Sequence, residues 1–201
     1  MLYLGTASGP QVRQAMADGR LGQMVTPQSG NRVVEGVPWV LDNGCFSASW
    51  DMYRWDAELE RHVDTPGCLF AVVPDVVADA TATFERWVRW WAAPMRRGYR
   101  CAYVAQDGCR FFPAGARALF IGGSTEWKLG PEARALAALA KDRGLWVHMG
   151  RVNSLRRLRY AADIGCDSVD GTYLAFGPEQ NLPTLLTWID PDQPGLFGGV
   201  A

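Results

Sequence analysis

Apolar residues gather along this chain in short continuous runs, separated by amphipathic or polar stretches. Seven such runs stand out, at residues 2–5, 39–41, 68–73, 101–105, 118–121, 145–149 and 168–169. They lack the alternation of polar and apolar residues that marks a strand with one face in water. Each run therefore predicts a strand buried on both faces, as in a parallel sheet covered by helices.

The stretches between these runs predict helices. Amphipathic spacing, a capping aspartate or serine, a proline in the first turn or a glycine at the end indicates them. The expected helices cover residues 11–18, 51–63, 79–97, 131–143, 154–164 and 182–189. Strands and helices thus alternate along the chain.

Polar and glycine residues follow the strands rather than precede them, and a (β/α)8 barrel builds its active site at that carboxyl-terminal end. We therefore predict a minimal TIM-like (β/α)8 barrel as a single domain over residues 1–190, with a loose C-terminal tail over residues 191–201. Residues 20–37 read as a polar loop, so the eighth strand is expected within 32–37 or 111–117. An open doubly wound sheet is the alternative, although no Gly-x-Gly-x-x-Gly follows the first strand.

Composition narrows the class of protein. The 201 residues are 48% apolar and 20% charged, with a net charge of −1, as in an ordinary globular domain without long-range attraction to nucleic acid. No apolar run is long enough to span a membrane, and the first residues lack the features of a signal peptide. The five cysteines show no Cys-x-x-Cys spacing, so we expect reduced thiols, no metal site and a cytoplasmic location.

Two strand ends carry aspartates followed by small residues. Asp42 precedes Asn43-Gly44, and Asp170 precedes Gly171. Two carboxylates in one pocket can divide the work of glycosyl transfer, one attacking the anomeric carbon and the other moving a proton. The alternative is that each aspartate caps the helix after its strand. A glycine behind Asp170 would leave room for a sugar.

Three further strand ends have groups that suit a planar base. Asp75 could accept two hydrogen bonds from an edge such as N1–H and the 2-amino group of guanine. Gln106 offers both a donor and an acceptor, and Gly122-Gly123 would present backbone N–H groups at close range. Each of these features also occurs in ordinary turns and caps.

Taken in order, the strand ends resemble the tRNA-guanine transglycosylase superfamily. The resemblance rests on Leu41-Asp42-Asn43-Gly44-Cys45-Phe46, Val73-Pro74-Asp75, Val104-Ala105-Gln106-Asp107-Gly108, Ile121-Gly122-Gly123-Ser124, His148-Met149-Gly150-Arg151-Val152 and Ser168-Val169-Asp170-Gly171-Thr172. Each segment is short, and the ordered set is what is specific. It spans about residues 41–172.

The resemblance implies a base exchange in which a 7-deazaguanine replaces guanine in a nucleic acid without a backbone break, and without a cofactor. Asp170 would be the nucleophile on C1′, and Asp42 the general acid and base. Asp75, Gln106 and the Gly122-Gly123 backbone would read the base. Met149-Gly150 would form part of the pocket wall.

The departures from the family favour DNA over tRNA as the substrate. The tRNA enzymes are longer and carry a zinc-binding Cys/His insertion that is missing here. The family motif after the Gly-Gly strand is altered to Ser124-Thr125-Glu126-Trp127-Lys128. The chain looks like the short phage and bacterial relatives that insert a 7-deazaguanine such as preQ0 into DNA. The resemblance then implies the cytoplasm of a bacterial or phage-infected cell, with a homodimer or a partner protein as open options.

Basic residues near the strand ends complete the expected site. Lys128, Arg151 and Arg110 would hold phosphates beside a flipped-out nucleotide. The arginines within helices, at positions 86, 89, 96, 97, 156, 157 and 159, are expected on solvated helix surfaces. The chemical alternatives are a nucleoside hydrolase or glycosidase using the same carboxylates, and a non-catalytic nucleic-acid-binding barrel.

Overall fold

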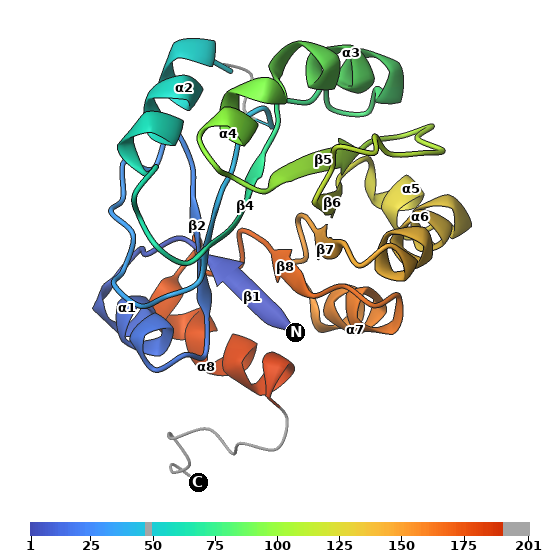
Figure 1. Cartoon of the computed structure of the whole chain (residues 1–201). Coiled ribbons are helices and arrows are strands. Elements are labelled where there is room, and N and C mark those ends of the chain that lie inside the picture. The colour runs from blue at the N-terminus through green and yellow to red at the C-terminus, as the bar shows by residue number, and fades with distance from the viewer. Residues whose placement is uncertain (47–49, 191–201) are drawn as a thin grey trace, which may run out of the picture.

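Eight parallel strands close into a barrel in the computed structural model, which describes residues 1–46 and 50–190. The strands follow one another around the barrel in chain order, and helices lie outside them (Figure 1). They are β1 (Leu2–Gly5), β2 (Gly22–Val25), β3 (Trp39–Leu41), β4 (Cys68–Val72), β5 (Cys101–Ala105), β6 (Ala118–Ile121), β7 (Trp146–Met149) and β8 (Ser168–Asp170). The predicted (β/α)8 barrel is confirmed, and the open-sheet alternative is wrong.

The helices are close to those expected, with two exceptions: one expected helix is broken, and the short helix at Thr125–Lys128 was not predicted. They are α1 (Pro10–Ala17), α2 (Met52–Arg61), α3 (Ala80–Trp90), α4 (Ala92–Arg96), α5 (Thr125–Lys128), α6 (Pro131–Asp142), α7 (Leu155–Asp163) and α8 (Pro178–Ile189). The single helix expected over residues 79–97 is two helices that meet at Trp91. Pro94 explains the break, because it has no N–H to donate and its ring crowds the carbonyl of Trp90.

The eighth strand lies at Gly22–Val25, within the stretch interpreted as a loop, and neither 32–37 nor 111–117 holds a strand. Gln23 is fully buried, yet its side-chain amide is satisfied. It donates to the Arg32 carbonyl at 3.0 Å and accepts from the Val34 N–H at 2.8 Å. A Cβ at Gly22 would lie 2.6 Å from a Leu4 methyl, so the glycine permits close strand packing. Gly22 and the buried Gln23 thus fit the structure of the strand, but they interrupt the apolar run by which the other strands were predicted.

Pairing of β1 with β8 closes the barrel. Leu2 lies opposite Ser168, Tyr3 opposite Val169 and Leu4 opposite Asp170. The register therefore carries the end of β8 to the same level as the end of β1. The barrel interior is filled by a separate cluster of apolar side chains, Leu4, Met24, Val40, Phe70, Val72, Ala102, Val104 and Ala118.

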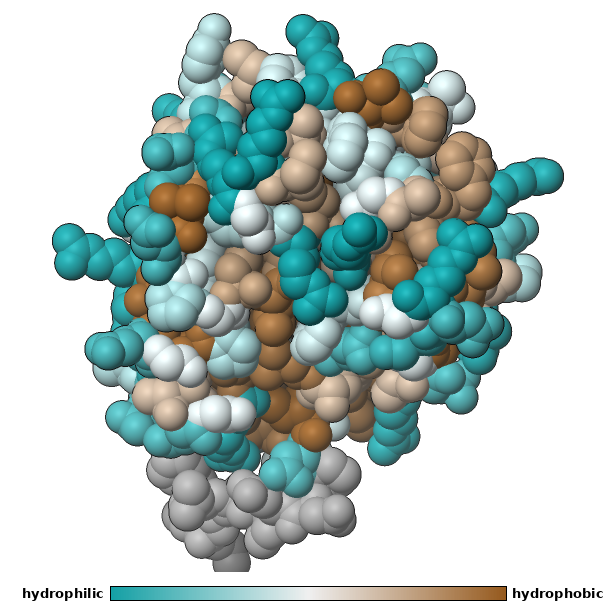
Figure 2. Space-filling model, in the orientation of Figure 1, coloured by the Kyte–Doolittle hydropathy of each residue, from teal (hydrophilic) through white to brown (hydrophobic). Residues whose placement is uncertain are grey.

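The outside of the barrel packs against its helices through a larger apolar cluster that includes Leu119, Leu136, Val147 and Met149. On the face seen in Figure 2, hydrophilic residues predominate, with hydrophobic residues exposed in smaller groups between them. No helix in the described ranges is long and apolar enough to cross a membrane. All five cysteines are free, as expected. The tail expected over 191–201 lies outside the described residues.

Candidate active site

A pocket of about 610 Å³ opens at the carboxyl ends of the strands. Its lining brings together eight of the residues singled out in the sequence, namely Asp42, Asp75, Gln106, Gly122, Gly123, Gly150, Arg151 and Asp170. They come from strands β3 to β8, separated by as many as 128 positions in the chain. A volume of this size is typical of sites for small molecules.

None of the three candidate aspartates caps a helix. Asp51 caps α2, accepting from the N–H groups of Tyr53 and Arg54, and Asp79 caps α3. Helix α8 begins after Gly177, with no side-chain cap. The capping alternative for the strand-end aspartates is therefore wrong, and their carboxylates remain available to the pocket.

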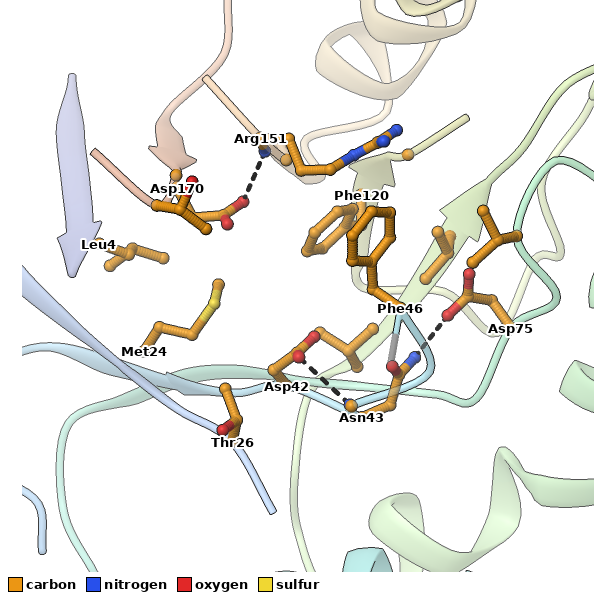
Figure 3. A pocket seen from close by; sticks show the side chains of 18 of the residues that line it. Leu4, Met24, Thr26, Asp42, Asn43, Phe46, Asp75, Phe120, Arg151 and Asp170 are labelled. Carbon is orange, nitrogen blue, oxygen red and sulfur yellow. Dashed lines mark hydrogen bonds between the residues drawn. The ribbon is translucent and has the colours of Figure 1, made fainter. Parts of the chain in front are cut away.

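Asp170 points into the pocket from the end of β8 (Figure 3). Its Oδ1 lies 3.0 Å from Nε2 of His148 and accepts a hydrogen bond from the Arg151 N–H at 3.2 Å. Its side chain is 18% exposed, whereas His148 is fully buried. Asp170 is thus anchored from behind and open toward the cavity.

Asp42 approaches the same pocket from the end of β3, with Leu4 and Met24 nearby (Figure 3). Its Oδ2 accepts from the Gly44 N–H at 3.2 Å. Burial raises the pKa of the Asp42 carboxyl to about 7, with a second contribution from the negative charge of Asp170. A carboxyl group that titrates near neutral pH is suited to both giving and taking a proton.

Asp75 is buried at the end of β4 and receives two side-chain amides. Asn43 Nδ2 donates to Oδ1 at 2.7 Å, and Gln106 Nε2 donates to Oδ2 at 2.5 Å. Burial raises the pKa of the Asp75 carboxyl, while these two hydrogen bonds oppose the rise. Each carboxylate oxygen keeps a further lone pair for a ligand.

The backbone after β6 is less available than the sequence implied. The Gly122 N–H donates to the Ala105 carbonyl at 2.9 Å, and the Gly123 N–H donates to Gln106 Oε1 at 2.8 Å. Gln106 Oε1 also accepts from the Ala78 N–H at 2.9 Å. Both glycines line the pocket, as expected, but their N–H groups already have partners.

Gly122 keeps the floor of the pocket clear. A Cβ there would lie 2.9 Å from both Gln106 Nε2 and a Val104 methyl. Gly150, at the end of the neighbouring strand β7, has the same effect, since a Cβ there would lie 2.6 Å from the Phe120 ring and 3.3 Å from Asp170 Oδ1. These positions admit no side chain without displacing a pocket residue.

Met149 does not form part of the pocket wall, contrary to expectation. Its side chain is fully buried and belongs to the apolar cluster between barrel and helices. Successive side chains in a strand point to opposite faces. His148 therefore points into the barrel and Met149 points outward, which leaves only Gly150 at the pocket.

Two of the three expected phosphate ligands do not line the pocket. Lys128 is buried, and its Nζ donates to the Gly150 carbonyl at 2.7 Å. Burial lowers the pKa of Lys128 to about 8, helped by the positive charge of Arg151. Arg110 is exposed but lies outside the pocket lining. Of these three residues, Arg151 alone lines the pocket, where its guanidinium lies over the Phe46 ring and donates to the Gly123 carbonyl.

Sequence reasoning missed a second arginine at the pocket. Arg157, expected on a solvated helix surface, lines the pocket from the first turns of α7. Its NH1 donates to the Arg151 carbonyl at 3.3 Å. A helix position gives no signal for this, because only the tertiary structure turns that side of α7 toward the barrel end.

His148 was missed as a side chain in contact with a candidate catalytic group. A signal did exist, since a histidine in the middle of an apolar strand must point either inward or toward the helices. Asn43 and Phe120, which also line the pocket, were not assigned roles either. Among residues 1–46 and 50–190, no three His, Cys, Asp or Glu side chains are grouped to hold a metal ion.

Gly171 lines the pocket and also has a structural reason to be a glycine that the sequence did not show. A Cβ at this position would lie 2.7 Å from the Val152 carbonyl and 2.8 Å from the Tyr3 hydroxyl, and would overlap the side-chain oxygen of Asn153. The glycine thus makes room for the loop after β7 rather than for a bound sugar alone.

Comparison with known proteins leaves the activity open, and the fold rests on the strand topology of the structure itself. No family model matches the chain, and no curated protein matches it. One similar solved structure is described as "Native KDPGal structure"; it is 11% identical, with 84% of this chain and 80% of that chain covered at a TM-score of 0.46. Another, "PaMucR Phosphodiesterase, c-di-GMP complex", is 16% identical, with 82% and 70% covered at a TM-score of 0.40. Likenesses this distant carry no argument about chemistry.

Proposed function

We propose that this protein is a transglycosylase that exchanges guanine in DNA for a 7-deazaguanine derivative through a covalent glycosyl-aspartate intermediate. One observation carries the proposal. Asp42 and Asp170 face the same pocket, and the pKa of Asp42 is raised to about 7 by burial and by the charge of Asp170. Two carboxyl groups with separate protonation behaviour are what a double displacement at a sugar carbon requires.

In the first half-reaction, the Asp170 carboxylate attacks C1′ and forms the ester bond. The C1′–N9 bond breaks, and its electron pair leaves with guanine. Protonated Asp42 gives its proton to the departing base, because neutral guanine is a far better leaving group than its anion.

In the second half-reaction, ionised Asp42 takes the N9 proton of the incoming deazaguanine. N9 attacks C1′, and Asp170 departs as a carboxylate. Asp42 regains its proton, so the cycle ends where it began, with the β configuration kept by two inversions. The exchange involves no oxidation and no phosphoryl transfer, and it therefore requires no cofactor.

The base would lie between the two aspartates and Asp75. The carboxylate of Asp75 suits N1–H and the 2-amino group, and Gln106 suits the neighbouring carbonyl. These groups now bind one another, since Gln106 donates to Asp75 at 2.5 Å. Binding of the base therefore replaces internal hydrogen bonds with hydrogen bonds to the ligand. Gly122, Gly123 and Gly150 leave the space that a planar ring needs.

DNA is the substrate we favour over tRNA, because the stretch Ser124-Thr125-Glu126-Trp127-Lys128 departs from the motif of the tRNA enzymes. Arg151 and Arg157, which both line the pocket, would contact phosphates beside the extruded nucleotide. The site we infer would thus act on a nucleotide taken out of the duplex stack.

Incubation with an oligonucleotide and a base analogue that binds but cannot attack C1′ is the decisive experiment. We expect a covalent protein–DNA adduct, seen as a mass shift on denaturing gels and mapped to Asp170. Asp170→Asn should give no adduct. Failure to trap any adduct with wild-type protein, on DNA or tRNA, would overturn the proposal.

An incubation with labelled 7-deazaguanine shows which nucleic acid is the substrate. Incorporation into single-stranded or duplex DNA supports the proposal, and incorporation into tRNA alone assigns the tRNA reaction instead. Release of free guanine without incorporation would assign a hydrolase.

A further inference from the structure

His148 lies directly behind the proposed nucleophile and has no role in the reaction described above. It is fully buried in the barrel interior, between the rings of Phe70 and Phe120, whose centroids lie 5.6 and 4.4 Å away. Its Nε2 lies 3.0 Å from Asp170 Oδ1, and its Nδ1 lies 2.9 Å from Ser168 Oγ. Both ring nitrogens are therefore engaged.

The donor and acceptor in each of these hydrogen bonds follow from Trp146, which contacts Ser168. The indole N–H of Trp146 lies 2.8 Å from Ser168 Oγ, and an indole can only donate. Ser168 is fully buried, so its own proton needs an acceptor within the protein. The lone pair of His148 Nδ1 is the acceptor at hydrogen-bond distance. The remaining ring proton of a neutral imidazole then lies on Nε2 and points at Asp170.

We infer that Trp146, Ser168 and His148 form a directed hydrogen-bond relay that fixes the Nε2–H tautomer of His148 and makes it the positioning residue of Asp170. What the positioned carboxylate does rests on the proposed function; the relay itself does not.

The relay assigns separate tasks to the two oxygens of Asp170. Oδ1 accepts from His148 and from the Arg151 N–H at 3.2 Å. Arg151 has a left-handed backbone, with φ at 59°, as it makes this contact. Within the described ranges, Oδ2 has no hydrogen-bond partner. Oδ1 is thus the anchored atom, and Oδ2 is the atom that forms the bond to C1′. Holding the carboxylate in one rotamer lowers the entropy lost on reaching the transition state.

Nitrogen-15 NMR tests the relay without any substrate. The chain contains two histidines, so a His62→Gln variant assigns both ring systems. We expect the two-bond proton–nitrogen pattern of the Nε2–H tautomer for His148 at pH 7.5. Ser168→Ala removes the donor to Nδ1 and should turn this single tautomer into a mixture. An Nδ1–H tautomer or a doubly protonated His148 ring in the wild-type protein would overturn the inference.

Kinetics of base exchange test the consequence for Asp170. His148→Leu removes the donor, whereas His148→Gln keeps an N–H group on a side chain of similar reach. We expect kcat to fall by about 100-fold in His148→Leu with KM for the base unchanged, and at least a tenfold recovery in His148→Gln. A fall of less than twofold in His148→Leu would contradict the positioning role. Wild-type protein without base exchange would defeat the proposed function while leaving the NMR result valid, so the two failures are distinct.

Discussion

The carboxyl groups of Asp42 and Asp170 face one another across the pocket as an unequal pair. Burial, and then the charge of Asp170, raises the pKa of Asp42 to about 7. Asp170 is held by His148 and the Arg151 N–H. A carboxyl group that keeps its proton to about pH 7 thus lies across the pocket from one that is anchored by two hydrogen bonds.

The raised pKa of Asp42 predicts a pH-dependent cost in stability. The folded protein keeps the Asp42 proton up to about pH 7, whereas the unfolded chain loses it near 3.8. The contribution of the Asp42 carboxyl to the free energy of unfolding is thus fully present below pH 3.8 and is lost as the pH rises through 7. The side chain at position 42 does not titrate in Asp42→Asn. The free energy of unfolding of this variant, measured relative to that of wild type, should therefore rise by up to roughly 4 kcal/mol from acidic pH to pH 8.

Urea unfolding of both proteins at pH 5 and pH 8 measures the part of this difference that arises between pH 5 and pH 7, about 2.7 kcal/mol. Asp142→Asn, a change at an exposed residue, is the matched control and should show no such trend. An Asp42→Asn variant with the same pH dependence as wild type would show that the Asp42 carboxyl is not held protonated by its surroundings.

Replacement of Asp75 by asparagine should harm both the fold and base recognition. Both oxygens of Asp75 accept from amide NH2 groups, at 2.7 and 2.5 Å, and an asparagine turns one acceptor into a third donor. We expect a loss of about 1–3 kcal/mol in the free energy of unfolding. Calorimetric titration should show that wild type prefers bases carrying a 2-amino group and that Asp75→Asn does not. Equal preference in both proteins would remove Asp75 from the recognition site.

The salt dependence of DNA binding should distinguish the basic residues that contact phosphates from those that do not. Arg151 and Arg157 line the pocket, whereas Lys128 is buried against Gly150. Arg157→Met should reduce the slope of log K against log salt by about 1. Lys128→Met and Arg110→Gln should leave that slope unchanged. A reduced slope for Lys128→Met would mean that its ammonium reaches a phosphate after all.

Gly171→Ala should destabilise the protein before it affects any substrate. The added Cβ would lie 2.7 Å from the Val152 carbonyl, and the Val152 N–H already donates to the Asp170 carbonyl at 2.6 Å. The backbone therefore has little freedom to move away. We expect a loss of about 1–3 kcal/mol, measured by thermal or urea unfolding. Gly115→Ala is the matched control, because Gly115 also lacks a positive φ and its added Cβ would meet the Trp91 ring at an ordinary 3.5 Å; its stability should change little.

The barrel was predictable because its strands are apolar throughout and its polar residues follow them. The one strand that escaped, Gly22–Val25, contains a buried glutamine whose partners are backbone groups of Arg32 and Val34. No pattern of polarity along the chain reveals that a polar side chain is satisfied by a loop nine residues away. Burial of Gln23 is a property of the tertiary structure.

The candidate site was predictable to the level of strand ends, and not to the level of side-chain direction. Position after a strand correctly brought Asp42, Asp75 and Asp170 to one pocket. It could not show that Lys128, on a short helix, turns inward, or that Arg157, on a longer one, reaches the pocket. Those outcomes depend on how each helix is rotated against the barrel, and this rotation cannot be predicted from short segments of the sequence.

The pairing of Leu4 with Asp170 has a consequence for how activity appears during folding. The first and last strands are the most distant in sequence, and the entropy of joining such segments makes their pairing slow. Asp170 gains its neighbours on both sides only when that seam forms. With the seam open, His148 and Arg151 would still hold the Asp170 carboxylate, but Asp42 would not face it across a closed pocket. Closure of the barrel is therefore the folding step that brings the two carboxyl groups together, and any activity that needs both would first appear with the complete native structure.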